Sequence, residues 1–224
     1  SALILTADLQ IIGQRHKDIK NSLSTPPRFT PRTLLNIAMH PGWATRMLRA
    51  KRYNFGNVVG HVEGIEKLAT LAQWSDEQLD PTLSWQDVAW VKDIWQGPIV
   101  IKGIMDAEDA DQAARQGVDA IVVSNHGGRQ LDGAPATIDV IADITRTVGD
   151  RAEVWLDSGI RSGQDILKAL ALGATGTMIG RAYQHGLGAM GQAGVTKCLE
   201  IIQKELDLTM GFCGVNDINA VSRK

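Results

Sequence analysis

A buried-strand run that ends in a polar, glycine-rich loop constrains this chain more than any other stretch. Residues 120–123 are apolar and largely β-branched, which is typical of a buried strand in a parallel sheet. The loop that follows supplies a hydroxyl (Ser124), an imidazole (His126), two glycines and a guanidinium (Arg129). The glycines let the backbone approach a ligand, and Arg129 can hold a carboxylate through two parallel hydrogen bonds. Because (β/α) enzymes place their chemistry at strand ends, we expect a functional site here.

Short β-runs alternate with helical stretches from residue 98 onward, which indicates βαβ units and a parallel sheet. Gly117 and Gly173 follow two of the predicted helices, where C-caps are needed. An earlier helix, over residues 85–95, carries Trp85 and Trp95, which we expect in the core. The predicted strands are residues 98–102, 120–124, 153–157 and 176–179, and the later helices are 107–116, 137–148, 162–172 and 195–206.

A further strand run, residues 2–5, lies at the start of the chain and ends in Thr6 and Asp8. With it the chain holds five β/α units, whereas a closed (β/α)8 barrel needs eight. The chain opens inside this strand without an initiator Met, so we expect an incomplete barrel that lacks its first three units. Its unpaired strand edges predict association with a complementing N-terminal half or with further copies.

A long insertion, residues 22–84, follows the first strand. Helices are predicted over residues 32–40 and from 42 to about 52, after a polar, loop-like stretch at 13–21. Residues 28–52 contain six basic residues and no acidic one, interleaved with apolar side chains. Such a segment is typical of helices that lie in an anionic membrane surface. A solvated lid, or a helix packed on its own barrel or on a neighbouring subunit, would show the same pattern.

Lys102 ends an apolar strand, and lysine is rarely buried without a partner. An ion pair with Asp8 or Asp157 around the barrel mouth is one explanation. A charge aimed at an anionic ligand is the other, and we favour it. A reduced flavin is such a ligand, because a fixed cation beside the ring stabilises the charge that develops there.

The last two strands are followed by Asp157-Ser-Gly-Ile-Arg161 and by Ile179-Gly-Arg181. The phosphate site of (β/α) barrels is typically built from the last two such loops. Glycines expose backbone N–H groups, a following helix start adds its dipole, and arginines chelate phosphate. We therefore predict that Arg161 and Arg181 contact a phosphate.

His126 fits a general base, with Asp8 across the barrel mouth as the carboxylate that orients it. Arg129 and Arg15 would hold a substrate carboxylate from two sides. We expect no metal at His126, because no second His or Cys stands at ligand spacing.

The string from Ile121 to Gly133 closely resembles the active-site signature of the FMN-dependent α-hydroxy acid oxidases and dehydrogenases. The resemblance covers nearly the whole chain, implies a (β/α)8 TIM barrel and places residue 1 at its fourth strand. It implies FMN as cofactor and the catalytic and substrate roles given above for His126, Asp8, Arg15 and Arg129, with Lys102 also acting on the flavin. The implied flavin-binding residues are Thr6, Lys102, Ser124, Asp157, Gly159, Arg161, Gly180 and Arg181.

The resemblance implies oxidation of an L-2-hydroxy acid, with L-lactate favoured, and oxygen, a quinone or a cytochrome as electron acceptor. Its membrane-associated bacterial members carry their attachment surface in the loop that corresponds to residues 28–52. The family's N-terminal half supplies tyrosines that touch the substrate, so we expect weak or no activity from this chain alone. A non-catalytic, truncated piece that binds flavin or phosphate, or only oligomerises, is the alternative. An NAD enzyme is disfavoured, because no G-x-G-x-x-G opens a helix after a strand.

The net charge and the cysteine content indicate which binding partners and which cell compartment to expect for the protein. The net charge is only −2, so no global field favours nucleic acid. Two cysteines, Cys198 and Cys213, in a chain of 224 residues are no disulfide framework. We expect a homo-oligomer in the cytoplasm or on the inner face of the membrane.

Overall fold

The computed structural model describes most of the chain, in two compact units. One unit comprises residues 1–10 and 82–224, and the other residues 11–81. Arg15 lies outside the described residues, as do Arg28, Lys51 and Arg52 of the basic segment. The described residues are 1–11, 13, 16–21, 29–50, 56–58, 61, 74 and 79–221.

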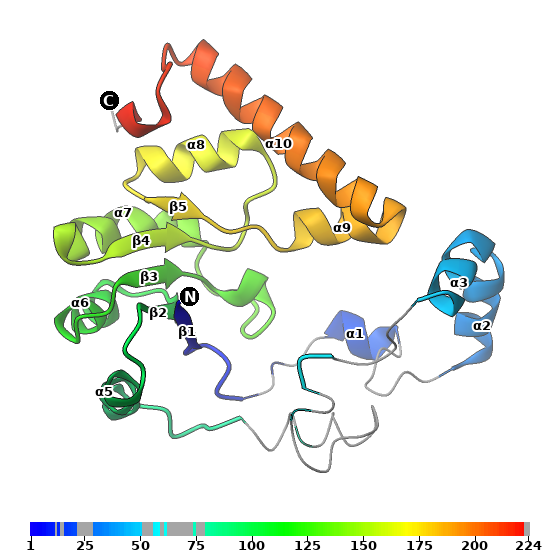
Figure 1. The fold of residues 1–224 in the computed structure, drawn as a ribbon, viewed down its shortest axis with the longest axis horizontal. Helices are drawn as coiled ribbons and strands as arrows, with labels where there is room; N and C mark the ends of the chain where they lie inside the picture. Colours follow the sequence, from blue (N-terminus) through cyan, green and yellow to red (C-terminus); the bar gives the residue numbers. More distant parts are fainter. Residues whose placement is uncertain are drawn as a thin grey trace. The chain divides into compact units, whose positions relative to one another are not determined.

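The larger unit is built on a five-stranded parallel sheet whose strands follow one another in chain order (Figure 1). A doubly wound sheet would reverse its strand order at a switch point, so this order is the one expected for consecutive β/α units of a barrel. The fifth strand is shorter than predicted. The strands are β1 Leu3–Thr6, β2 Ile99–Ile104, β3 Ala120–Val123, β4 Glu153–Leu156 and β5 Gly176–Thr177.

Helices follow the strands as predicted up to β5. Figure 1 shows α6, α7 and α8 along one side of the sheet. Gly117 and Gly173, with φ of 70° and 99°, end α6 and α8 in the backbone conformation predicted for them. The helices are α5 Trp85–Ile94, α6 Ala107–Arg115, α7 Thr137–Val148 and α8 Gly163–Ala171, with short 3₁₀ turns η1 His126–Gly128, η2 Gly149–Arg151 and η3 Ile218–Ala220.

The prediction after β5 was incomplete. Where one helix was expected over residues 195–206, the chain forms α9, Arg181–Met190, and a longer α10, Gln192–Phe212. The helix α9 was not predicted, because glycines at 186 and 188 lower the helix propensity of its sequence. The two helices contact each other closely, and α10 also contacts α8 (Figure 1). Tertiary contacts therefore outweigh the local sequence preference here.

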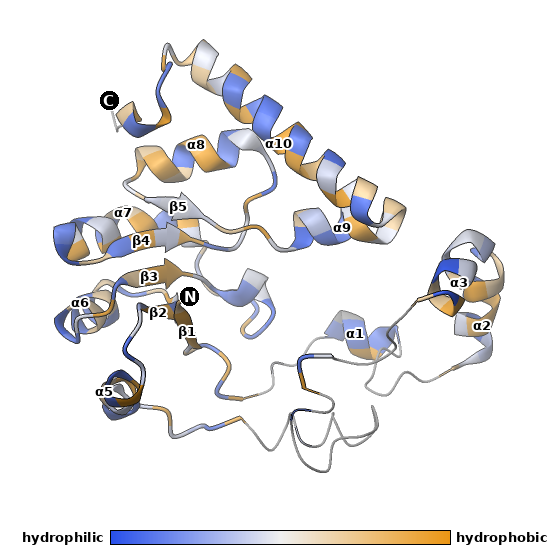
Figure 2. Cartoon of the chain, viewed as in Figure 1, coloured by the Kyte–Doolittle hydropathy of each residue, from blue (hydrophilic) through white to orange (hydrophobic). Residues whose placement is uncertain are grey.

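The sheet has a different core on each face. The larger cluster lies on the helix-covered face, where Trp85 and Trp95 pack against it as predicted. The smaller cluster, on the opposite face, consists of Val100, Ala120 and Val122 with Trp155 and Met178. Figure 2 shows β1 and β3 in hydrophobic colours and the turn after β3 in hydrophilic ones. Side chains alternate between faces along a strand, so the face that bears the smaller cluster continues into polar residues at the strand ends.

The smaller unit contains α1 His16–Lys20, α2 Pro31–Ala38 and α3 Pro41–Leu48. The polar stretch at 13–21, expected as a loop, thus includes a short helix at its end. α2 and α3 contact each other. None of the helices in the described part of the chain has the length and apolar character needed to cross a membrane.

Candidate active site

The carboxyl ends of β2, β3 and β4 are joined by a buried hydroxyl. Ser124 is 0% exposed, and its Oγ accepts hydrogen bonds from Lys102 Nζ at 2.9 Å and from the His126 backbone N–H at 3.1 Å. The same hydroxyl donates to Asp157 Oδ2 at 2.7 Å. Lys102 Nζ lies 3.0 Å from that carboxylate oxygen. The strand ends thus bring an ammonium, a hydroxyl and a carboxylate into one network.

Lys102 therefore makes the ion pair with Asp157 that was the less favoured of its two explanations. Burial works to raise the pKa of the Asp157 carboxyl. Hydrogen bonds from Ser124 and Lys102, together with the Lys102 charge, outweigh burial and hold that pKa below its usual value. Asp157 therefore remains ionised at neutral pH and holds Lys102 near the carboxyl end of β2, a strand that runs two residues further than predicted, to Ile104.

His126 is paired with Asp8, as predicted. Its Nδ1 lies 3.2 Å from Asp8 Oδ1, and the two side chains are 26% and 15% exposed. The other carboxylate oxygen, Asp8 Oδ2, is buried and has no hydrogen-bond partner among the described residues. A carboxylate in this position can fix the imidazole tautomer and stabilise the imidazolium.

Gly103 makes room for Asp8, a role that sequence reasoning missed. It has φ 105° and lies at a shift in the β2–β3 register. A Cβ at Gly103 would lie 2.8 Å from the Asp8 Cβ and Cγ atoms. The signal was present in the sequence, because a glycine inside a strand indicates a bulge or a close backbone approach.

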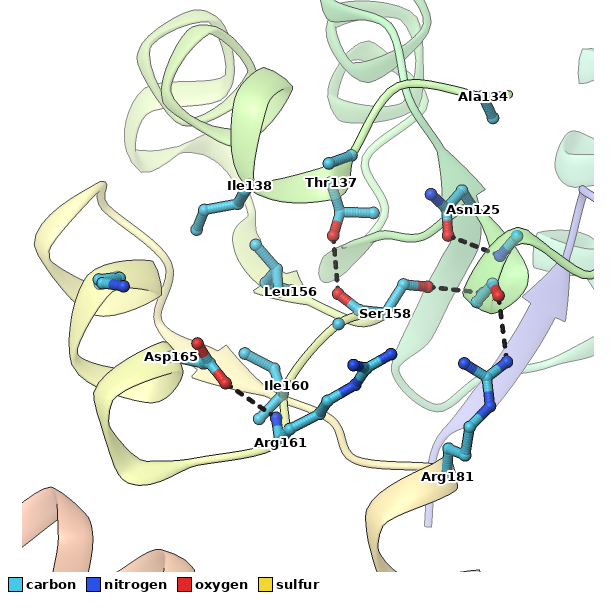
Figure 3. Close-up of a pocket in the computed structure, with 15 residues that line it drawn as sticks. Asn125, Ala134, Thr137, Ile138, Leu156, Ser158, Ile160, Arg161, Asp165 and Arg181 are labelled. Atoms are coloured by element: carbon cyan, nitrogen blue, oxygen red, sulfur yellow. Dashed lines mark hydrogen bonds between the residues drawn. The ribbon is translucent and has the colours of Figure 1, made fainter. Parts of the chain in front are cut away.

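A cavity of about 400 Å³ lies beside this network, within the usual size range of ligand pockets. Its lining includes Gly127, Ser158, Gly159, Arg161 and Arg181. Figure 3 shows both arginine side chains directed toward the turn that follows β3. Arg161 comes from the loop after β4 and Arg181 from the start of α9. Two guanidinium groups beside glycine backbone are suited to a phosphate.

Two helices begin near this cavity, and they differ in how their first N–H groups are used. At the start of α8, Asp165 Oδ2 accepts from the N–H groups of Arg161 and Ser162 at 3.0 Å each, and Glu205 accepts from Gly163 at 3.1 Å. α9 begins after Gly180 without a side-chain cap. A helix dipole available to an anion is therefore expected from α9 rather than from α8.

The family profile of the FMN-dependent dehydrogenases matches residues 1–224. The chain belongs to this family. Its fold agrees, since the sequential parallel sheet is the expected portion of the family's barrel, and FMN is the family's cofactor.

Relatives with assigned activities are longer than this chain. An L-lactate dehydrogenase of Caulobacter vibrioides is 40% identical over 223 residues, which are 99% of this chain and 58% of that protein. One from Vibrio cholerae is 40% identical over 222 residues, with 99% and 58% covered. A crystal structure of the monotopic membrane protein (S)-mandelate dehydrogenase superposes with TM-score 0.92 and 35% identity over 99% of this chain and 58% of that one.

The structure also places most of the remaining residues that were predicted to bind FMN or substrate. Thr6 ends β1 and is in register with Lys102. Gly159, with φ 93°, lines the cavity, and Gly180 precedes α9. Arg129 is exposed at the end of η1, next to the His126 turn but not in the cavity lining. Arg15 cannot be placed, because it lies outside the described residues.

Proposed function

We propose that the protein carrying this chain oxidises an L-2-hydroxy acid, preferentially L-lactate, to the 2-oxo acid with FMN. The observation that carries the proposal is the His126–Asp8 pair beside the Lys102–Ser124–Asp157 network at adjacent strand ends. A base with an orienting carboxylate and a fixed cation are the groups that this oxidation requires.

The described residues fit FMN. Arg161 and Arg181 line one cavity with Gly159, which suits the phosphate of the cofactor. The Lys102 ammonium has three N–H donors, and Ser124 and Asp157 take two of them. The third would face the flavin ring, with Thr6 and Ser124 as neighbours. When bound, FMN supplies the acceptor for the two electrons that leave the substrate.

His126 removes a proton from the substrate. The base must be a neutral imidazole with its Nε2 free to accept, which requires the Nδ1–H to point at Asp8. The 3.2 Å separation between Nδ1 and Asp8 Oδ1 suits that tautomer. Once His126 is protonated, the Asp8 carboxylate stabilises the positive charge through the same contact.

Arg129 holds the substrate carboxylate, and the family resemblance assigns the same role to Arg15. Arg129 follows the His126 turn directly, so a carboxylate on its planar fork would bring the α-carbon near the imidazole. The preference for L-lactate rests on the 40% identical relatives named L-lactate dehydrogenase. (S)-Mandelate is the alternative substrate, because a solved neighbour is an (S)-mandelate dehydrogenase.

A direct assay tests this function. The purified protein, loaded with FMN, is incubated with an artificial electron acceptor and with L-lactate, D-lactate or (S)-mandelate, and the products are identified. The proposal predicts pyruvate from L-lactate, less product from (S)-mandelate and none from D-lactate. Absence of a 2-oxo acid from every substrate would contradict it.

A non-catalytic role in binding flavin or phosphate is the second candidate. The cavity lined by Arg161 and Arg181 favours it, because that cavity needs neither His126 nor Asp8. A yellow protein whose flavin spectrum no 2-hydroxy acid changes would support it.

We also propose that the protein associates peripherally with a membrane through α2 and α3. Large apolar side chains on these helices are exposed, and residues 29–50 carry three arginines and no acidic residue. The structurally similar (S)-mandelate dehydrogenase is a monotopic membrane protein. A membrane location would favour a quinone over oxygen or a cytochrome as acceptor. The exposed apolar residues are Leu34, Leu35, Met39, Trp43, Met47 and Leu48.

A further inference from the structure

We propose that Ser158 is a positioning residue for His126, a role that rests on the proposed function of His126 as the base. Ser158 lies in the loop after β4, and its Oγ accepts a hydrogen bond from the Gly127 backbone N–H at 2.9 Å. Gly127 directly follows His126. The bond therefore ties the turn that carries the imidazole to the neighbouring loop.

The backbone at both ends of this bond is unusual. His126, with φ 57°, and Ser158, with φ 75°, are the two non-glycine residues of the described chain that have positive φ. Residues with a Cβ rarely adopt this conformation, and it persists where surrounding contacts hold it. Such positions cluster at functional sites. The hydrogen bond between the two loops is a contact of the kind that holds both.

Further hydrogen bonds fix the same residue and the same loop. Arg181 Nη2 donates to the Gly127 carbonyl oxygen at 3.2 Å, so Gly127 is held both at its backbone N–H and at its C=O (Figure 3). Thr137 Oγ1 donates to the Ser158 carbonyl oxygen at 2.9 Å. Thr137 is only 2% exposed, so water cannot easily replace this bond. Ser158 is thus anchored to α7 while it holds Gly127.

The residues that hold Gly127 belong to the loops that line the cavity. Ser158 and Arg161 share the loop after β4, and Arg181 begins α9. A phosphate bound by the two arginines would fix these loops and, through Ser158 and Arg181, the turn that carries His126. Binding of an anion in the cavity therefore helps to keep the His126 imidazole in the position in which it pairs with Asp8.

Amide hydrogen exchange at Gly127 tests the link without reference to catalysis. Ser158→Gly removes the hydroxyl and tolerates the positive φ. One net hydrogen bond corresponds to about fivefold to tenfold in the opening equilibrium, so exchange at Gly127 should speed up by that factor relative to Val154 in β4. In the wild type, saturating inorganic phosphate should slow exchange at Gly127, and in the variant it should slow it less.

Ser162→Ala is the matched control. It removes another serine hydroxyl four residues further on, one bonded to Asp165 at 2.9 Å, so it should lower thermal stability without changing exchange at Gly127. Thr137→Val, which removes the anchor of Ser158 on α7, should raise exchange at Gly127 even if Ser158→Gly fails to fold. Thr137→Ser, which keeps a hydroxyl, should not.

Turnover and FMN affinity, measured together, distinguish a positioning role of Ser158 from a direct contact between Ser158 and the cofactor. In the FMN-loaded protein, Ser158→Gly should lower kcat for L-lactate about tenfold while the Kd of FMN is unchanged, because a misplaced base slows the reaction without loosening the phosphate. Unaltered exchange at Gly127, or a fall in FMN affinity that matches the fall in rate, would overturn the proposal. If the wild type oxidises no 2-hydroxy acid yet shows the exchange pattern, the proposed function fails while the link through Ser158 is supported.

Discussion

His126 is restrained at three points, by Asp8 and Ser158 from distant parts of the sequence and by the nearby Ser124. Asp8 meets its Nδ1, Ser124 accepts from its backbone N–H, and Ser158 accepts from the N–H of the next residue. In its proposed role as the base, a histidine held in this way would need little reorganisation before it takes a proton, which is the physical basis of positioning in catalysis.

Replacing His126 should abolish turnover without releasing FMN. His126→Gln removes the base, and loss of a general base costs on the order of 10²–10⁴-fold in rate. His185→Gln, an exposed histidine of α9, is the control and should behave as the wild type. Stopped-flow absorbance gives the rate of flavin reduction, and ultrafiltration gives bound FMN. Release of FMN with an unaltered rate would contradict the role given to His126.

Gly103→Ala should displace Asp8 from His126. The new Cβ would lie 2.8 Å from the Asp8 side chain at a backbone φ of 105°. Gly149→Ala is the control, because Gly149 also has positive φ, 58°, but no atom lies within 4 Å of its added Cβ.

Both substitutions should destabilise through backbone strain, by about 1–2 kcal/mol. Gly103→Ala should cost about 1–3 kcal/mol more through the clash, and it alone should slow turnover. Urea unfolding and kcat measure the two effects. Equal losses of stability in the two variants would show that Asp8 does not depend on Gly103.

The Asp157 carboxylate should make stability depend on pH. Its pKa is lowered in the folded protein, so it stabilises the fold above the unfolded value of about 3.9, and this stabilisation is lost as pH falls through the folded value. Asp157→Asn should lower the unfolding free energy by about 2 kcal/mol at pH 7, and the gap to the wild type should close in acid. Urea unfolding at a series of pH values measures it.

Asp143→Asn serves as the control for Asp157→Asn. Asp143 is 68% exposed and pairs with Arg146, which is 71% exposed, so its loss should change stability little at any pH. A gap between wild type and Asp157→Asn that stays constant down to low pH would contradict the lowered pKa.

Sequence reasoning found the residues whose chemistry is unusual for their position. Lys102 stands out because a charged side chain directly follows an apolar run, and His126 because a titratable one lies in the polar loop just after such a run. Ser158 and Gly103 did not stand out, because their roles depend on a backbone angle and on a contact with a distant loop. Such contacts exist only once the strands are aligned.

At the scale of elements, strand order could be predicted and the last helices could not. The β/α units up to β5 each carry their own apolar period, and α5, α6 and α8 have their own N-cap side chains, which are local signals. The helices α9 and α10 are held together by a contact that no local pattern predicts. A Cβ at Gly194 would collide with the Gly186 carbonyl oxygen, so the two backbones meet at these glycines.

Gly194→Ala should therefore separate α9 from α10. The inserted methyl should cost about 1–3 kcal/mol or more in unfolding free energy, despite the better helix propensity of alanine. Gly188→Ala is the matched control, because no atom lies within 4 Å of its added Cβ, and it should stabilise by up to about 1 kcal/mol. Thermal unfolding compares them. The same sign of effect for both would contradict the close helix contact.

At the scale of the whole molecule, the basic surface of α2 and α3 should give affinity for anionic membranes. Each arginine near such a surface contributes about 1 kcal/mol, or about fivefold in binding. The double variant Arg46→Gln, Arg49→Gln should therefore bind anionic vesicles about 25-fold more weakly in a flotation assay.

A matched variant separates this surface from net charge alone. The double variant Arg115→Gln, Arg146→Gln has the same net charge and changes two exposed arginines of the larger unit. It should bind vesicles like the wild type. Equal weakening in both double variants would show that net charge, and not α2 with α3, governs binding.

The most direct test of the account is the absorbance of the flavin on anaerobic addition of L-lactate to the purified, FMN-loaded protein that carries this chain. If His126, Asp8 and Lys102 form one site beside the cofactor, the flavin band should bleach, with one pyruvate formed for each FMN. A stably bound flavin whose band neither L-lactate nor (S)-mandelate changes would contradict it.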